Sequence, residues 1–219
     1  LLCIDEASQV LRQIALAGCV DNPVLVHNFL SEMIRETKRV VMCDADANDQ
    51  LIEYCQLIDP DRPIHIFEVE TDNSHITIDH TDATTVFQMA LDDIAKGEKV
   101  LIANDSANDG KKLFTKIEKD HPELKVIHVH KDSKSDPEIE AFLKEPNTEA
   151  RKYDVIIYSP AISSGVSITD EHFTKHYGLF FGSVSPADAH QMLRRDRSAG
   201  HFTVGLSIPA QTLETDRDQ

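Results

Sequence analysis

Short apolar runs and amphipathic stretches alternate along most of the chain. The apolar runs are typical of buried strands, whereas apolar residues three or four positions apart are typical of helices. We expect helices at residues 7–17, 24–36, 49–58, 83–95, 106–119, 136–143 and 186–195. We expect strands at residues 1–4, 39–43, 65–70, 75–80, 99–103, 125–129, 155–158, 178–181 and 202–206. This alternation predicts an α/β fold of parallel sheets with flanking helices.

The pattern restarts near residue 81, where we expect a domain boundary. Residues 1–81 contain enough elements for about half of an α/β domain, whereas residues 82–219 contain enough for a complete one. The chain opens on an apolar run that passes straight into Asp5 and Glu6, so we expect it to be part of a longer protein.

Composition narrows the class of protein. The chain has 219 residues and a formal net charge of −16, which argues against a basic nucleic-acid-binding surface over its whole length. It leaves room for a local basic cluster, which Arg194, Arg195 and Arg197 supply. No apolar run approaches the ~20 residues of a membrane span, so we expect no membrane partner. The four cysteines lack C-x-x-C spacing, which favours a reducing cytoplasmic compartment over zinc or disulfides.

Acidic residues follow the first two predicted buried strands. Asp5 and Glu6 would lie at the carboxyl end of a parallel strand, where one carboxylate can hold Mg²⁺ and the other can orient a water. An acidic pair that opens a helix is also favoured by the helix dipole without any ligand. Asp44 and Asp46 have three interpretations: a metal site of a phosphotransferase, a sensor loop beside the first strand, or a solvated turn that caps a helix.

A loop rich in small hydroxyl residues follows the predicted strand at 155–158. Ser163, Ser164, Gly165 and Ser167 would supply hydroxyls and backbone N–H groups for the phosphate oxygens of a nucleotide or of a nucleic-acid backbone. The same residues are also compatible with a plain turn between a strand and a helix.

Three arginines lie in and just after the predicted helix at 186–195. Guanidinium groups match phosphate geometry and can stabilise the charge that develops in phosphoryl transfer. The alternative is a basic helix end that complements its own dipole.

Five segments follow one another in order. They are Asp-Glu-Ala-Ser (5–8), Asp-Ala-Asp (44–46), Val-Leu-Ile-Ala-Asn-Asp-Ser (100–106), Ser-Pro-Ala-Ile-Ser-Ser-Gly-Val-Ser-Ile (159–168) and Gln-Met-Leu-Arg-Arg-Asp-Arg (191–197). In this order they resemble motifs II, III, IV, V and VI of superfamily 2 helicases. The last two segments are most similar to herpesvirus-type origin-binding-protein helicases and their plasmid or phage relatives.

The resemblance implies a partial first RecA-like domain and a complete second one. It also implies ATP and Mg²⁺ as cofactors, and as partners DNA, single-stranded or at a replication origin, together with replication proteins. Asp5 would help hold Mg²⁺ and Glu6 would position the hydrolytic water, while Asp44 and Asp46 would couple hydrolysis to domain movement.

The resemblance assigns the remaining candidate residues to phosphate groups. Contacts with nucleic-acid phosphate or nucleotide would come from Ser163, Ser164, Gly165, Ser167 and Gln191. Arg195 and Arg197 would be arginine fingers, and Arg194 stands where the family usually has Gly. The chain contains no phosphate-binding G-K-[ST] loop, so we predict that alone it hydrolyses ATP negligibly.

Two other functions fit parts of the sequence. A non-catalytic helicase-like module for protein contacts or replication-complex assembly would account for the acidic charge and for Arg194. A Mg²⁺-dependent phosphotransferase built on Asp44 and Asp46 would require a second carboxylate group at that site and leaves the arginines unexplained.

Overall fold

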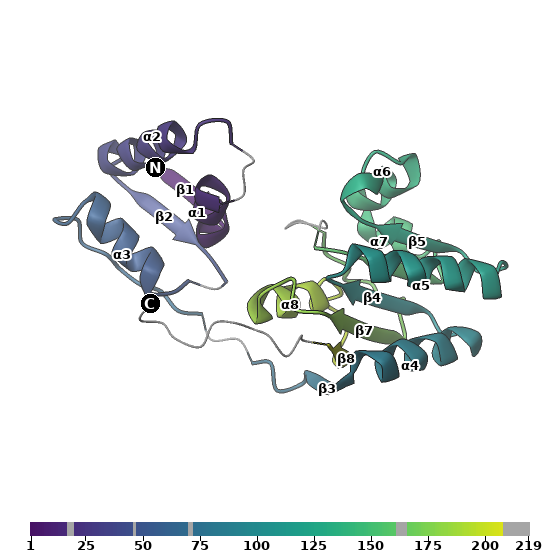
Figure 1. Cartoon of the computed structure of the whole chain (residues 1–219). Helices are drawn as coiled ribbons and strands as arrows, with labels where there is room; N and C mark the ends of the chain where they lie inside the picture. Colours follow the sequence, from purple (N-terminus) through teal and green to yellow (C-terminus); the bar gives the residue numbers. More distant parts are fainter. Residues whose placement is uncertain (17–19, 46, 70–71, 161–165, 208–219) are drawn as a thin grey trace. The chain divides into compact units, whose positions relative to one another are not determined.

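The computed structural model describes residues 1–16, 20–45, 47–69, 72–160 and 166–207. The chain divides into two units, residues 1–70 and residues 71–219, and each is described by itself (Figure 1). Each unit contains its own parallel sheet.

The first unit is built on a two-stranded sheet. Strands β1 (Leu2–Asp5) and β2 (Val40–Cys43) are parallel, and Asp5 lies opposite Cys43. Three helices accompany them: α1 (Ala7–Leu16), α2 (Pro23–Glu36) and α3 (Asp49–Ile58). Asn22 and Asn48 cap α2 and α3 with their side-chain oxygens, which explains where these helices begin.

The second unit contains a six-stranded sheet in the order β3-β8-β7-β4-β6-β5. Its strands are β3 (Thr77–Asp82), β4 (Val100–Asn104), β5 (Val126–Val129), β6 (Val155–Tyr158), β7 (Lys175–Phe180) and β8 (His201–Leu206). All neighbouring pairs are parallel, so the carboxyl ends of the strands share one edge of the sheet. The predicted α/β fold with parallel sheets is confirmed.

Helices cover both faces of this second sheet, as Figure 1 shows. They are α4 (Ala83–Ala95), α5 (Ala107–Asp120), the 3₁₀ turn η1 (Lys131–Ser133), α6 (Pro137–Lys144), α7 (Pro146–Ala150) and α8 (Pro186–Leu193). On one face, α4 and α5 pack against Val100 and Ile102 of β4. On the other, Phe142 of α6 and Leu193 of α8 share a core with Leu101. Because β4 is buried on both faces, its sequence is a continuous apolar run.

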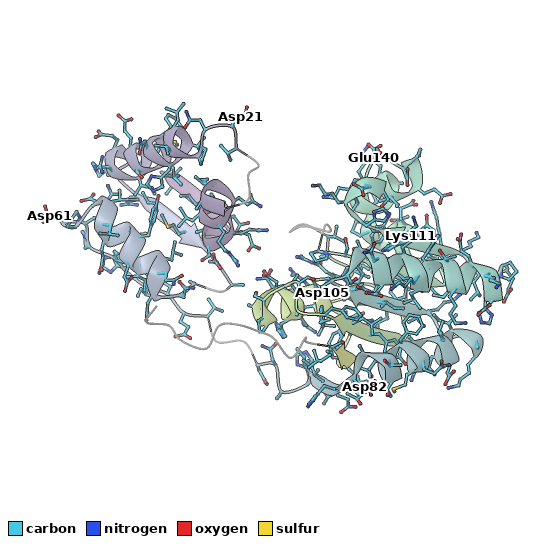
Figure 2. The ribbon with its side chains drawn as sticks, viewed as in Figure 1. Asp21, Asp61, Asp82, Asp105, Lys111 and Glu140 are labelled. Carbon is cyan, nitrogen blue, oxygen red and sulfur yellow. The ribbon has the colours of Figure 1, made fainter. Side chains whose placement is uncertain are left out.

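The ends of α4 follow from two residues. Asp82, labelled in Figure 2, accepts the N–H of Thr85 at 2.9 Å and caps the first turn. Gly97 follows the last turn with φ +84°, a backbone conformation that favours glycine. Together they produce the bounds that the sequence predicts, 83–95.

The division of the chain differs from the boundary expected near residue 81. The strand expected at 65–70 is absent from residues 65–69, and the next one, β3, opens the second unit rather than closing the first. β3 pairs with β8, with Ile78 opposite Phe202. Alternating polarity indicates that a segment forms a strand but not which sheet it joins, so the boundary lies at residue 70.

Candidate functional site

The predicted acidic pair lies at the carboxyl end of β1. Asp5 is the last residue of the strand, and its Oδ1 accepts the backbone N–H of Glu6 at 3.2 Å. Glu6 has φ +52°, the only positive φ of a non-glycine residue in the described part of the chain. Such backbone strain in a residue with a side chain is concentrated at functional sites, because the surrounding structure must impose it.

Asp44 lies close to this acidic turn. β1 and β2 are neighbouring parallel strands, so the residues that follow them meet at the same edge. The Oδ2 of Asp44 accepts the N–H of Ser8 at 2.6 Å, across 36 positions of sequence. The structure thus joins the two predicted acidic segments through a direct hydrogen bond, whereas Asp46 lies outside the described residues.

These carboxylates do not form a complete cage for a cation. Within the described ranges, no group of three or more His, Cys, Asp or Glu side chains is arranged to hold a metal ion. Mg²⁺ usually binds through one or two carboxylates, with waters and substrate phosphates supplying the other ligands. Asp5 and its neighbours therefore fit Mg²⁺ only in the company of a phosphate-bearing ligand.

The serine-rich loop is only partly described. Ser163, Ser164 and Gly165 lie outside the described residues. The hydroxyl of Ser167 is buried and has no hydrogen-bond partner among the residues that the structure describes. A buried hydroxyl without a partner is costly, so Ser167 is a reasonable ligand contact.

The arginine segment begins at the carboxyl end of α8, which carries Gln191. The buried Tyr158 hydroxyl donates to the carbonyl of Met192 at 2.6 Å, which ties the last turn of α8 to the end of β6. Arg194 is the C-cap, and its Nη1 donates to the carbonyl of Ala199 at 2.8 Å. Its φ of −80° is accessible to any residue, so the backbone here does not require the glycine usual in the family.

The two predicted arginine fingers lie in different surroundings. Arg197 is exposed, whereas Arg195 is half-buried beside Leu101, Tyr158 and Ile168. The Nε of Arg195 has no partner among the described residues, and over the same residues neither guanidinium is paired with a carboxylate. In an acidic chain, two unpaired guanidinium groups in neighbouring positions are suited to phosphate.

Sequence reasoning missed a residue that organises the loops of the second unit. Asp105 follows β4 and is buried, and its two oxygens accept the N–H groups of Phe181 and Ser183, each at 2.8 Å. It thereby fixes the loop between β7 and α8. The sequence places Asp105 in the third helicase-like segment, residues 100–106, but nothing in that pattern indicates its contacts.

One cavity has none of these predicted residues in its lining. It has a volume of about 800 Å³ and is lined near the start of β7 and β8 by residues that include Glu171, Lys175, Tyr177 and His201.

Comparison with known proteins finds relatives in two viruses, and no family model matches the chain. The "Putative helicase/primase complex protein" of African swine fever virus (isolate Tick/Malawi/Lil 20-1/1983) is 27% identical over 168 residues, which are 75% of this chain and 15% of that protein. The "Uncharacterized putative helicase R8" of Acanthamoeba polyphaga mimivirus is 24% identical over 183 residues, 80% of this chain and 17% of that protein. The chain thus spans less than a fifth of either relative.

Two solved structures resemble the chain over nearly its whole length. S. cerevisiae Dbp5 bound to RNA and ADP BeF3 matches 94% of this chain and 52% of its own, with a TM-score of 0.60 and 17% identity. The chain shares the α/β fold of the RecA-like domains in this helicase structure. Mss116p bound to ssRNA and AMP-PNP matches 94% of this chain and 43% of its own, with a TM-score of 0.56 and 12% identity. In the described part of this chain, every helix is too short or too polar to cross a lipid bilayer.

Proposed function

We propose that the chain is part of a cytoplasmic ATP-dependent DNA helicase or translocase that acts in replication initiation of a virus, plasmid, phage or mobile element. The helicase-like fold and the helicase names of both viral relatives support a helicase-related function. The printed name of the swine fever virus protein places it with a helicase/primase complex, which supports replication proteins as partners. The two solved structures are bound to RNA, but we propose DNA for this chain, because the helicase/primase name and the resemblance to origin-binding helicases both favour replication.

The observation that carries the proposal is the pair of unpaired guanidinium groups at Arg195 and Arg197. A guanidinium group that has no carboxylate partner can serve phosphoryl transfer by neutralising the charge that develops on the phosphate. In the first unit, Asp5 would bind Mg²⁺ and Glu6 would orient the attacking water. Asp44, which is hydrogen-bonded to Ser8, would couple hydrolysis to domain movement. Gln191 and Ser167 would contact nucleotide.

We further propose that this chain alone turns over ATP negligibly. The sequence contains no G-K-[ST] loop, so it lacks the backbone cradle and lysine that such loops offer to the β- and γ-phosphates. The chain also corresponds to only 15–17% of the length of its relatives. The activity is therefore assigned to the longest natural polypeptide that contains this sequence.

The test compares Glu6→Gln and Arg197→Ala in that longest polypeptide, by DNA-stimulated ATP hydrolysis. Each substitution is expected to lower kcat by about 10³-fold, as for loss of an arginine finger. Glu32→Gln and Arg151→Ala are matched controls, because both side chains are exposed, and they should leave turnover unchanged. Full turnover in both Glu6→Gln and Arg197→Ala would overturn the proposal.

A further inference from the structure

The backbone of Arg195 and Arg197 is hydrogen-bonded to one residue of the preceding loop, Ile168. The N–H of Ile168 donates to the carbonyl of Arg195 at 2.7 Å, and the N–H of Arg197 donates to the carbonyl of Ile168 at 2.8 Å. Asp196, between the two arginines, is thereby paired with Ile168 as a short parallel bridge. The backbone is fixed on both sides of Asp196.

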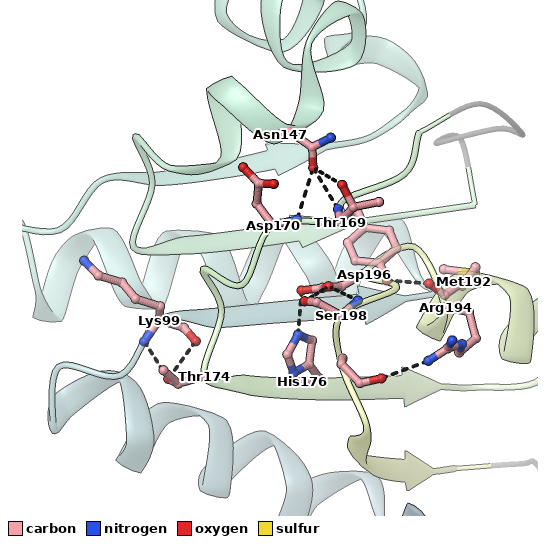
Figure 3. A network of polar contacts seen from close by, with 12 residues as sticks. Lys99, Asn147, Thr169, Asp170, Thr174, His176, Met192, Arg194, Asp196 and Ser198 are labelled. Atoms are coloured by element: carbon pink, nitrogen blue, oxygen red, sulfur yellow. Dashed lines mark hydrogen bonds and ion pairs between the residues drawn. The ribbon is translucent and has the colours of Figure 1, made fainter. Parts of the chain in front are cut away.

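The side chain of Asp196 is held inside the second unit, as Figure 3 shows. It is fully buried, and its Oδ2 lies 2.9 Å from Nε2 of His176 on β7. Its Oδ1 accepts both the N–H of Ser198 at 3.0 Å and the Ser198 hydroxyl at 2.5 Å. Burial by itself raises the pKa of Asp196, but the hydrogen bonds from His176 and Ser198 outweigh it and bring this pKa below its ordinary value. The carboxylate is therefore ionised at neutral pH.

The Asp196 carboxylate is hydrogen-bonded to His176 and Ser198, so in the part of the chain that the structure describes it forms no ion pair with Arg195 or Arg197. A buried carboxylate needs hydrogen-bond donors, and the two nearest in sequence are the guanidinium groups of Arg195 and Arg197. Over the described residues, neither of them pairs with it, because His176 and Ser198 occupy both of its oxygens. Asp196 is buried, whereas Arg197, the next residue, is exposed, so the two side chains have different surroundings.

We propose that Asp196 is a positioning residue for Arg197, and that His176 holds Asp196 in that role. The pair aims the guanidinium of Arg197 at a nucleotide phosphate and prevents its own carboxylate from neutralising that cation. This inference rests on the proposed function, because Arg197 has a phosphate to contact only if the parent polypeptide hydrolyses ATP.

The first experiment replaces Asp196 in the longest natural polypeptide that contains the chain. Asp196→Asn keeps the size of the side chain and one acceptor for Ser198, but it removes the charge. We expect kcat for ATP to fall about 10- to 100-fold, as for a misplaced catalytic group, and KM for ATP to change less than about threefold. Asp170→Asn is the matched control, since Asp170 pairs with Arg151 at the surface, and it should leave both constants unchanged.

The second experiment asks whether Asp196 acts through Arg197. In a background that already carries Arg197→Ala, Asp196→Asn should lower kcat by less than about twofold, because the group that it positions is gone. A purely structural loss would instead multiply with the loss from Arg197→Ala, and that result would overturn the inference.

The third experiment uses His176, whose ring is nine-tenths buried. His176→Gln keeps an N–H donor for Asp196 and should retain most of the turnover, whereas His176→Phe should match Asp196→Asn. If His176→Phe does not fold, the comparison of Asp196→Asn with His176→Gln decides. Normal turnover in Asp196→Asn, in a polypeptide that Arg197→Ala inactivates, refutes the positioning role alone. Full turnover in Arg197→Ala refutes the positioning role, and full turnover in both Arg197→Ala and Glu6→Gln refutes the proposed function as well.

Discussion

Acidification should destabilise the second unit through His128. This side chain lies on β5, is only 8% exposed, and has its ring 6.1 Å from that of Phe114 and 4.7 Å from that of His130, between centroids. Burial, and secondarily the charge of His130, lower the pKa of His128 from 6.5 to about 4. The folded protein therefore holds His128 neutral under conditions in which the unfolded chain binds a proton there.

The sign and size of the effect follow from these two pKa values. Between pH 6.5 and about 4 the unfolded chain binds more protons at His128, so the free energy of unfolding falls as the pH falls. The contribution is complete above pH 6.5 and is lost progressively towards pH 4. At roughly 1.4 kcal/mol per pKa unit, the full difference is about 3 kcal/mol, an upper bound for a ring near other titrating groups.

The test measures hydrogen exchange on the whole chain at pH 7, 6, 5 and 4. Exchange in peptides from β5 and β6 gives the free energy of unfolding of that part of the sheet. Other groups also titrate in this range, so the informative quantity is the difference between wild type and His128→Leu. We expect the variant to lose less stability than wild type between pH 7 and 4, by about 2–3 kcal/mol. His80→Leu, at an exposed position of β3, is the control and should follow wild type. Equal slopes for wild type and His128→Leu would refute the reasoning.

Three further predictions concern single residues. Glu6→Gly relieves the positive φ and should raise the unfolding free energy of the first unit by about 0.5–1 kcal/mol, while it abolishes ATP turnover in the longest natural polypeptide; a less stable variant in denaturant titration would contradict this. Asp105→Ala removes the acceptor of two N–H groups and should cost about 2–4 kcal/mol, with faster hydrogen exchange in the loop at 181–185; unchanged exchange there would oppose it. Gly205→Ala places a Cβ 2.7 Å from the Cα of Ala83 and should cost about 2–3 kcal/mol by thermal unfolding, and a wild-type midpoint would show that α4 can shift.

Much of the fold could be predicted because its signals are local. The apolar runs of β4 and β6 are buried on both faces, and α4 has a capping Asp82 before it and Gly97 after it. β7 was expected to begin at residue 178, but it begins at Lys175, because its first two residues are polar and only half-buried at the sheet edge. The short helix α7 was not predicted at all.

The sequence predicts the residue types of the candidate site but not the hydrogen bonds that join them. The order of the acidic, serine-rich and arginine-rich segments pointed to phosphate chemistry, and parallel topology brought Asp44 to the acidic turn. The function of Asp196 could not be predicted, because a carboxylate between arginines is expected to pair with them. One of its two partners, His176, lies 20 positions away in the sequence and is identified only by the structure, in which β7 lies beside the segment that contains Asp196.

The pairing of β3 with β8 gives the second unit a mechanical property. The N–H of Thr77, the first residue of β3, donates to the carbonyl of Gly200 at 2.8 Å, and the neighbouring carbonyl of Ala199 accepts the guanidinium of Arg194. A pull directed along β3 would load its hydrogen bonds to β8 in shear, so that these bonds resist it together. The start of β3 is therefore bonded to the residue that follows Ala199, the residue whose carbonyl holds Arg194.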